Sequence, residues 1–468
     1  YRLYIDENQP LERRYRQLRE SLERVVRERI QGNSLQTTDL AARINYVATQ
    51  YELDIKEQNQ LHTFRLTSND ILNHRKFPAK EEFLRDLRAV AFAYRKMFAQ
   101  DIPLKLFSVL PKQEITSLGK KEKKEYIRRI RVCFDYADDT YLYVHPVDII
   151  ADEPIRVVYN KPGINHEFEE TIKELWRYAQ LNLLDVFVDR EGIYTPSFIV
   201  LEPDYLIDIS SLAECYKDYG SHPANYFLSR LVPIDNARPL LLGNIANLFL
   251  DEWIHAGEEE PDYIDCMKKA FRQYPIELAA CAELRDPSKE KEFAKDCRMH
   301  FEHIRDIVQH TFLEPGYNLD KKDAVLEPSY ICEALGIQGR LDYMQRDMSS
   351  FIEMKSGKAD EFSIQGKVEP KENNKVQMLL YMAVLEYSMG QDRRRMHPYL
   401  LYTRYPLLYP ARASWAQVRR VINLRNRIVA AEYGVQFHNH SDFTRNLLAQ
   451  INPEVMNERK LRGRFWEQ

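Results

Sequence analysis

Hydrophobic residues recur every three or four positions through the first hundred residues of the chain. Two such stripes consist of Leu11, Tyr15, Leu18, Leu22 and Val25, and of Phe83, Leu87, Val90, Tyr94 and Met97. This spacing places apolar side chains on one face of an α-helix. The pattern predicts a helical region over residues 1–100, whose stripes serve core packing or a partner helix.

The pattern changes to alternation in residues 101–204. Residues 130–134 and 140–144 read as two strands on either side of a turn at 137–139, which predicts a β-rich region forming a small barrel or sheet. The run before them, residues 120–131, mixes Lys and Arg with Tyr126. Such a run fits either a nucleic-acid surface or a solvated loop, and the sequence leaves both open.

A second alternating stretch carries the candidate chemistry. In residues 351–355, Glu353 and Lys355 project to one face of a strand while Ile352 and Met354 point into a core. Residues 339–342 form a strand-like run before this strand, and residues 347–350 form a turn between the two. Asp342 would therefore meet Glu353 and Lys355 across a hairpin. Two carboxylates and an ammonium form an oxygen-rich site for a divalent cation and a phosphate.

These residues occur in an order that resembles the PD-(D/E)XK nuclease superfamily, and more closely its RecB-like branch. Gly339 precedes Asp342, Glu353 and Lys355 form a Glu-x-Lys strand, and Gln377 and Tyr381 lie four apart on one helical face. The chain is similar over residues 205–430 to the nuclease part of DNA replication ATP-dependent helicase/nuclease fusions.

The resemblance implies an α/β fold. We expect a restriction-endonuclease-like mixed sheet flanked by helices over residues 205–430, preceded by the helical region (1–100) and the small β-rich region (101–204). Residues 431–468 would then be a basic C-terminal segment or a linker to a domain outside this chain.

The resemblance also assigns roles in metal-assisted phosphodiester hydrolysis. Asp342, Glu353 and the main-chain carbonyl of Met354 would hold magnesium or manganese, and Lys355 would orient the attacking water or stabilise charge on phosphorus. Gln377 and Tyr381 would position the strand and shape the site.

The chain departs from the family at the first metal ligand, which is usually a His on an upstream helix. In residues 242–251 the corresponding position is Asn247, whose amide oxygen can complete the metal shell only weakly. Asp251 lies four residues on, on the same helical face, and could substitute. His255 fits a solvent-facing residue at a helix end better than a ligand.

Six dispersed cysteines form no Cys-x-x-Cys pair, which argues against a zinc ribbon and a disulfide framework. Relatives in this branch often bind an iron–sulphur cluster through one Cys before the catalytic core and three after it. Cys215 could be the first, but no Cys follows Cys332, so we expect no cluster. Cys297 and His303 share a predicted helix with His300 and His310 but lie six positions apart on different faces, which disfavours a metal site there.

Composition and charge add limits. The length of 468 residues predicts several domains, and a composition of 44% hydrophobic and 29% charged residues is typical of globular proteins. No apolar run suits a membrane span or a signal peptide, so we expect a cytoplasmic protein. The net charge is −4, yet residues 392–468 hold 14 Lys and Arg against 6 Asp and Glu. The basic clusters there, at Arg393–Arg395, Arg419 and Arg420, and Arg459 and Lys460, fit phosphate contacts, a basic solvent face or a linker.

These features predict a DNA nuclease, acting on single strands or DNA ends in replication, recombination or repair. No phosphate-cradling Gly-x-x-x-x-Gly-Lys-Ser/Thr motif is present, so a helicase partner would be a domain or subunit outside this chain. One alternative is a catalytically weak nucleic-acid-binding scaffold for such a helicase. A second is an interaction protein built on the N-terminal stripes, which the set of Asp342, Glu353, Lys355, Gln377 and Tyr381 disfavours.

Overall fold

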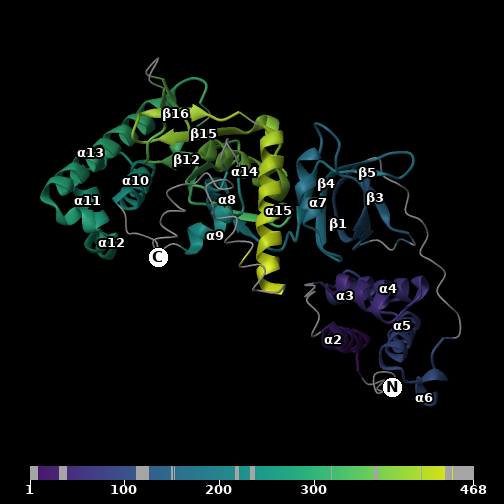
Figure 1. Ribbon diagram of the computed structural model, residues 1–468. Coiled ribbons are helices and arrows are strands. Elements are labelled where there is room, and N and C mark those ends of the chain that lie inside the picture. The colour runs from purple at the N-terminus through teal and green to yellow at the C-terminus, as the bar shows by residue number, and fades with distance from the viewer. Residues whose placement is uncertain are drawn as a thin grey trace. The chain divides into compact units, whose positions relative to one another are not determined.

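The computed structural model shows a mixed α/β protein whose contacts divide the chain into two compact units (Figure 1). Unit 1 comprises residues 1–203 and 429–444, and unit 2 comprises residues 204–428 and 445–468. The residues described by the structure are 9–30, 39–111, 126–148, 151, 153–216, 221–231, 238–317, 319–362, 367–412, 414–437 and 445. Within these ranges, no helix combines the length and apolar character needed to cross a membrane.

Unit 1 begins with helices. They are α2 (Leu11–Ile30), α3 (Leu40–Gln50), α4 (Ile55–Leu72), α5 (Lys80–Phe98) and the short α6 (Leu104–Phe107). The two hydrophobic stripes of the sequence fall on α2 and α5. Tyr15, Leu22 and Phe83 are fully buried in their common core, as the spacing requires. Helix α4 starts at a capping box in which Asp54 and Glu57 each accept a hydrogen bond from the other's backbone N–H.

A buried carboxyl group lies in this helical core. The Tyr15 hydroxyl donates to Oδ2 of Asp86 over 3.0 Å, while Oδ1 is buried with no hydrogen-bond partner among the described residues. Burial raises the pKa of Asp86 to about 7, against the opposing effect of the Tyr15 hydrogen bond. The charged form of Asp86 is therefore disfavoured in the folded protein.

We expect the contribution of Asp86 to the stability of unit 1 to rise as the pH falls from 8 to 4, whereas the buried His62, whose pKa is lowered to about 3, acts in the opposite direction. Between the ordinary pKa of an Asp and the raised folded value, the folded state holds a proton that the unfolded state has lost, so rising pH costs up to about 4 kcal/mol. Asp86→Asn should remove this dependence in thermal unfolding followed from pH 4 to 8. The exposed Asp101→Asn should behave as the wild type, and an unchanged pH profile in Asp86→Asn would contradict the assignment.

The second part of unit 1 is a closed barrel, one of the two forms predicted for this region. Its strands are β1 (Tyr126–Ala137), β2 (Tyr141–Pro146), β3 (Ile155–Val158), β4 (Gln180–Val188), β5 (Tyr194–Thr195) and β6 (Phe198–Leu201). Strand β1 pairs with both β2 and β4, and the pairings β2–β3, β3–β5 and β5–β4 complete the circuit. The short helices η1 (His166–Phe168) and α7 (Glu169–Lys173) connect β3 to β4.

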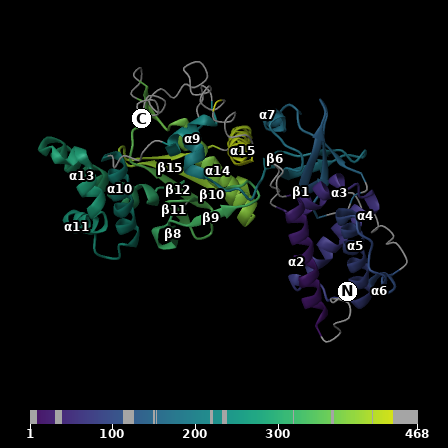
Figure 2. The same ribbon diagram turned by 60° about the horizontal axis from the view of Figure 1, so that its bottom comes forward.

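The described residues of unit 2 form three sheets. The strands are β7 (Ile207–Asp208), β8 (Ala324–Leu326), β9 (Ser329–Cys332), β10 (Ile337–Arg340), β11 (Tyr343–Gln345), β12 (Ser350–Lys355), β13 (Asp360–Phe362), β14 (Lys367–Glu369), β15 (His397–Tyr402) and β16 (Leu407–Pro410). The largest sheet has the order β16-β15-β12-β11-β8, of which β15, β12, β11 and β8 are labelled in Figure 2. It is mixed, because β12 is parallel to β15 and antiparallel to β11. A three-stranded sheet has the order β7-β10-β9, and β13 pairs with β14.

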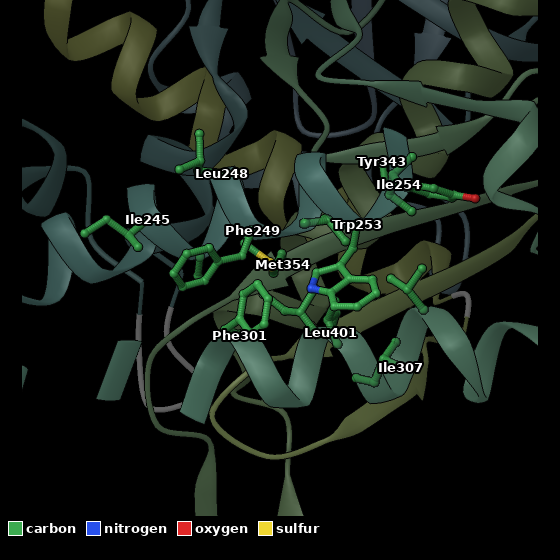
Figure 3. Packing of buried hydrophobic residues seen from close by; sticks show 14 of the residues in the cluster. Ile245, Leu248, Phe249, Trp253, Ile254, Phe301, Ile307, Tyr343, Met354 and Leu401 are labelled. Carbon is green, nitrogen blue, oxygen red and sulfur yellow. The ribbon is translucent and has the colours of Figure 1, made fainter. Parts of the chain in front are cut away.

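Helices cover both faces of the five-stranded sheet. The helices that follow β7 along the chain are α8 (Ile209–Glu214), α9 (Ala224–Leu231), α10 (Arg238–His255), α11 (Tyr263–Gln273), α12 (Pro275–Ala280), α13 (Pro287–Gln309), α14 (Glu372–Met389) and α15 (Trp415–Phe437), with single turns η2 (Ala282–Arg285), η3 (Thr311–Leu313), η4 (Lys321–Asp323) and η5 (Arg393–Arg395). On one face, Phe249 of α10 and Phe301 of α13 pack with Met354 and Leu401 of the sheet (Figure 3). Helix α14 contacts β15 and donates to Glu353, on the opposite face of β12.

Helix α15 is fastened to unit 2 by a buried arginine. The Arg425 guanidinium is fully buried and donates to the backbone carbonyl of Gly336, over 3.1 Å, and to that of Tyr205. Gly336 has a left-handed φ of 64°, and a Cβ at this position would lie 2.6 Å from Cζ of Arg425. Both the backbone conformation and the close approach therefore require glycine.

Candidate active site

Asp342 lies where the chain passes from one sheet to another. Strand β10 of the three-stranded sheet ends at Arg340, and β11 of the five-stranded sheet begins at Tyr343. The sequence predicted residues 339–342 as the first strand of the hairpin, which is wrong: the hairpin is β11 and β12, and Asp342 immediately precedes it. Continuing the register of Tyr343 with Ile352 places Asp342 opposite Glu353.

The side chain of Asp342 is held against β12. Its Oδ2 accepts a 2.6 Å hydrogen bond from the backbone N–H of Met354. The carbonyl oxygen of Asp342 accepts from the N–H of Glu327, over 3.1 Å. These two bonds fix the Asp342 carboxylate beside Glu353, the residue that precedes Met354.

Strand β12 separates its side chains as the alternation predicts. Ile352 and Met354 are buried in the core that includes α10 and α13. Glu353 and Lys355 share the other face, where Nζ of Lys355 donates to Oε1 of Glu353 over 2.9 Å. The ammonium and one carboxylate of the predicted set are therefore in direct contact.

Helix α14 brings Gln377 and Tyr381 to this face. Nε2 of Gln377 donates to Oε1 of Glu353 over 2.6 Å and to Oγ of Ser210 over 3.0 Å. The Tyr381 hydroxyl donates to the carbonyl of Arg340 over 2.6 Å. Both side chains thus bind protein groups at the base of the site, one on β12 and one on the chain leading to Asp342.

The close approach of Tyr381 explains the glycine three residues before Asp342. A Cβ at Gly339 would lie 2.9 Å from the Tyr381 hydroxyl oxygen and 3.1 Å from Cδ1 of Ile209. These separations are shorter than van der Waals contact, so a side chain at Gly339 would displace Tyr381 or the backbone. The glycine and the tyrosine therefore form one structural unit.

We expect Gly339→Ala to destabilise unit 2 by about 1–3 kcal/mol, the usual cost of overpacking a filled site. The displaced Tyr381 would release the carbonyl of Arg340, so the position of Asp342 should change as well. Gly357→Ala is the control, because a Cβ at Gly357 meets no atom within 4 Å. Thermal unfolding of both variants measures the difference, and equal transition temperatures would contradict the close approach.

Burial dominates the electrostatics of the two carboxylates. Glu353 is only 5% exposed, and burial followed by the charge of Asp342 raises its pKa, while the Lys355 ammonium opposes the shift. Burial likewise raises the pKa of Asp342, against the Met354 hydrogen bond and the charge of Lys355. A buried carboxylate with a half-buried one beside it forms a site that favours an additional positive charge.

One oxygen of the pair is available for a ligand. Oε2 of Glu353 is buried and has no hydrogen-bond partner among the described residues, whereas Oε1 accepts from both Lys355 and Gln377. Carboxylate and carbonyl oxygens suit magnesium or manganese. In the described part of the chain, no group of three or more His, Cys, Asp or Glu side chains is arranged to hold a metal. The ligands predicted from the sequence include only two such side chains, Asp342 and Glu353, and the others are the carbonyl oxygen of Met354 and the amide oxygen of Asn247.

Helix α10 presents Gly243, Asn247 and Asp251 at intervals of four on one face. Gly243 lies near the end of β12, since a Cβ there would be 3.2 Å from Oγ of Ser356. Asp251 lies toward Asp342: burial, then the negative charges of Glu327 and Asp342, raise its pKa to about 6. Asn247 is half-buried and lies one helical turn from both Gly243 and Asp251. Asp251 is thus the charged group that this helix face brings toward Asp342.

His255 and Glu327 complete this edge of the site. His255 is exposed at the end of α10, as expected, and its ring contacts the carbonyl of Asp251 over 2.9 Å. Glu327, which the sequence analysis missed, lies between β8 and β9 with a φ of 49° and accepts from Arg340 over 3.1 Å. A lone Glu between two short strands gives no periodic or spacing signal that could have identified it.

The other candidate groups have structural contacts. All six cysteines are buried and free of disulfides, with Cys215 at the end of α8 and Cys297 on the buried face of α13. His300 and His303 contact the side chain and the carbonyl of Thr403, over 2.8 and 2.9 Å. Two of the α13 histidines considered for a metal are therefore engaged with Thr403, the residue that follows β15.

Some of the basic residues considered for nucleic-acid contacts lie in the part of the chain that the structure describes. Arg459, Lys460 and residues 120–125 lie outside the described residues. Arg393 pairs with Glu386 over 3.2 Å and lies above the ring of Trp415. Tyr126 is exposed at the start of β1, and its hydroxyl donates to Asp185 over 2.6 Å.

Comparison with known proteins adds no relative: neither the protein-family models nor the curated proteins contain a match to this chain.

Proposed function

We propose that this protein is a metal-dependent DNA nuclease of the PD-(D/E)XK superfamily, RecB-like branch. The order of elements supports this proposal: helix α10 is followed by the β11–β12 hairpin, helix α14 and strand β15, with β12 and β15 parallel. A restriction-endonuclease-like sheet would carry its acidic hairpin and Glu-x-Lys strand in this arrangement. The mixed sheet with helices on both faces is compatible with it.

The observation that carries the proposal is the buried Oε2 of Glu353, which has no hydrogen-bond partner in the described part of the chain. A buried carboxylate oxygen without a partner is costly unless a ligand or cation satisfies it. The N–H of Met354 fixes Asp342 beside Glu353, and Nζ of Lys355 lies 2.9 Å from Oε1, the other carboxylate oxygen of Glu353. This combination supports cation binding next to a group that can contact a phosphate.

Asp342, Glu353 and the Met354 carbonyl would hold magnesium or manganese, with Asn247 or Asp251 from α10 completing the shell. A bound ion would polarise the scissile phosphate and lower the pKa of the attacking water. Lys355 would stabilise negative charge that develops on the phosphate oxygens.

The family resemblance gave Gln377 and Tyr381 a role in positioning the DNA strand. Their contacts here support a more indirect role, since Gln377 orients Glu353 and Tyr381 holds the carbonyl of Arg340, two residues before Asp342. Both would shape the site without touching the substrate.

The substrate would be single-stranded DNA or DNA ends, and the partner a helicase domain or subunit outside this chain. The absence of a Gly-x-x-x-x-Gly-Lys-Ser/Thr motif from the sequence supports an external motor. Work in replication, recombination or repair, by a cytoplasmic protein, would fit such a partnership.

End-labelled single- and double-stranded DNA, incubated with the purified chain and magnesium, manganese or a chelator, tests the proposal. We expect cleavage with either metal and none with the chelator. Binding without cleavage in both metals would instead favour a nucleic-acid-binding scaffold for a helicase. The uncharged amide of Asn247 at the usual His position is the observation in favour of that second function.

Metal preference provides a separate prediction. If Asn247 completes the metal shell, Asn247→His should raise the ratio of manganese-supported to magnesium-supported cleavage by about tenfold, because imidazole suits manganese better than magnesium. Metal titrations of the cleavage rate measure the ratio. Asn244→His, elsewhere on the same helix, should leave it unchanged, and equal ratios in both variants would exclude Asn247 from the shell.

A further inference from the structure

Ser210 lies in a short corner that the backbone fixes next to the site. Strand β7 pairs in parallel with β10, Ile207 with Ile337 and Asp208 with Gln338, and α8 follows directly. Oδ1 of Asp208 caps this helix by accepting from the N–H of Ser211 over 3.0 Å. The strand pairing and the cap place the first turn of α8, with Ser210, beside the chain that leads to Asp342.

Ser210 shares a donor with Glu353. The amide nitrogen of Gln377 has two hydrogens, and it donates across 2.6 Å to Oε1 of Glu353 and across 3.0 Å to Oγ of Ser210. Gln377 is only 3% exposed, so water cannot replace either acceptor readily. The position of Glu353 therefore depends on how the Gln377 amide is turned.

A flipped amide would not support the site. Turning it by half a rotation would direct the carbonyl oxygen of Gln377 at Oε1 of Glu353, and two acceptors at that distance repel each other. In the orientation that donates to Glu353, the second N–H of Gln377 needs an acceptor, and Ser210 provides it. Without that acceptor a buried N–H loses its partner, which favours rotation of the amide.

We propose that Ser210 is a positioning residue of this site: it holds the Gln377 amide in the orientation that donates to Oε1 of Glu353 and so keeps Oε2 directed toward the ligand. The catalytic consequence rests on the proposed nuclease function, whereas the effect on Gln377 does not. Ser210 does not act on the substrate itself.

Cleavage kinetics test the catalytic consequence through a double-mutant cycle. Ser210→Ala should lower kcat about tenfold with little change in KM, the factor expected from one lost hydrogen bond. Ser210→Thr keeps the hydroxyl and should recover most of the rate, and Ser211→Ala should match the wild type. Because Ser210 acts through Gln377, adding Ser210→Ala to Gln377→Ala should cause no further loss. Independent, additive losses would overturn the proposal.

A second measurement does not depend on activity. In protein labelled with ¹⁵N-glutamine, the side-chain amide signal of Gln377 is the one lost in Gln377→Ala. We expect Ser210→Ala to shift this signal and to speed exchange of its hydrogens about tenfold, and Ser211→Ala to leave it unchanged. An unchanged Gln377 signal in Ser210→Ala overturns the proposal even if cleavage falls. If the wild type cleaves no DNA, the nuclease assignment fails, and the amide signal alone decides the role of Ser210.

Discussion

Glu353→Gln and Asp342→Asn are each expected to lower metal-dependent DNA cleavage by on the order of 10³-fold. Each substitution removes one of the two charged oxygen ligands in the predicted set while keeping the size of the side chain. Asn at position 342 retains an oxygen that can accept the N–H of Met354, so the hairpin should keep its geometry. The loss should therefore come from metal binding and chemistry, with the fold intact.

Initial rates with magnesium and with manganese, together with thermal unfolding, measure this outcome. Glu314→Gln changes an exposed carboxylate of the same unit and should keep the wild-type rate. If Glu353→Gln and Asp342→Asn both cleave DNA at the wild-type rate with unchanged transition temperatures, these carboxylates are not the metal site.

Gly336→Ala should produce the largest loss of stability in unit 2. A non-glycine residue at a left-handed φ costs about 1–3 kcal/mol, and overlap with the buried Arg425 adds about 1–3 kcal/mol more. The second cost arises because Arg425 cannot move away without giving up its bonds to the carbonyls of Gly336 and Tyr205.

Gly390→Ala separates the two costs. Gly390 has a φ of 72° at the end of α14, and a Cβ there would meet no atom within 4 Å. Its replacement should therefore show the backbone cost alone. Thermal unfolding and amide hydrogen exchange in α15 compare the variants, and equal losses would mean that Arg425 yields to the new side chain freely.

The sequence predicted those parts of the site that depend on local periodicity. Alternation along β12 placed Glu353 and Lys355 on one face, and four-residue spacing placed Gln377 and Tyr381 on one face of a helix. Such patterns are local because burial selects side chains at the period of the strand or helix.

Other features of the fold depend on which strands pair with each other, and this pairing leaves no periodic pattern in the sequence. Nothing in the sequence around Leu341 shows that the chain leaves one sheet and enters another, because a strand reads alike in either sheet. The same holds for the barrel: the hairpin of β1 and β2 was predictable from its turn, whereas the pairing of β1 with β4 was not. Ser210 and Glu327 reach the site through such pairings.

The site also combines contacts of very different sequence separation. The bond from Met354 to Asp342 spans 12 positions and that from Gln377 to Glu353 spans 24, whereas the bond from Gln377 to Ser210 spans 167. At about 5–20 residues per second, a ribosome needs roughly ten seconds or more after Ser210 before Gln377 is made. A nascent chain therefore contains Ser210 without its partner for that time, and cleavage of the proposed kind would begin only after synthesis has passed helix α14.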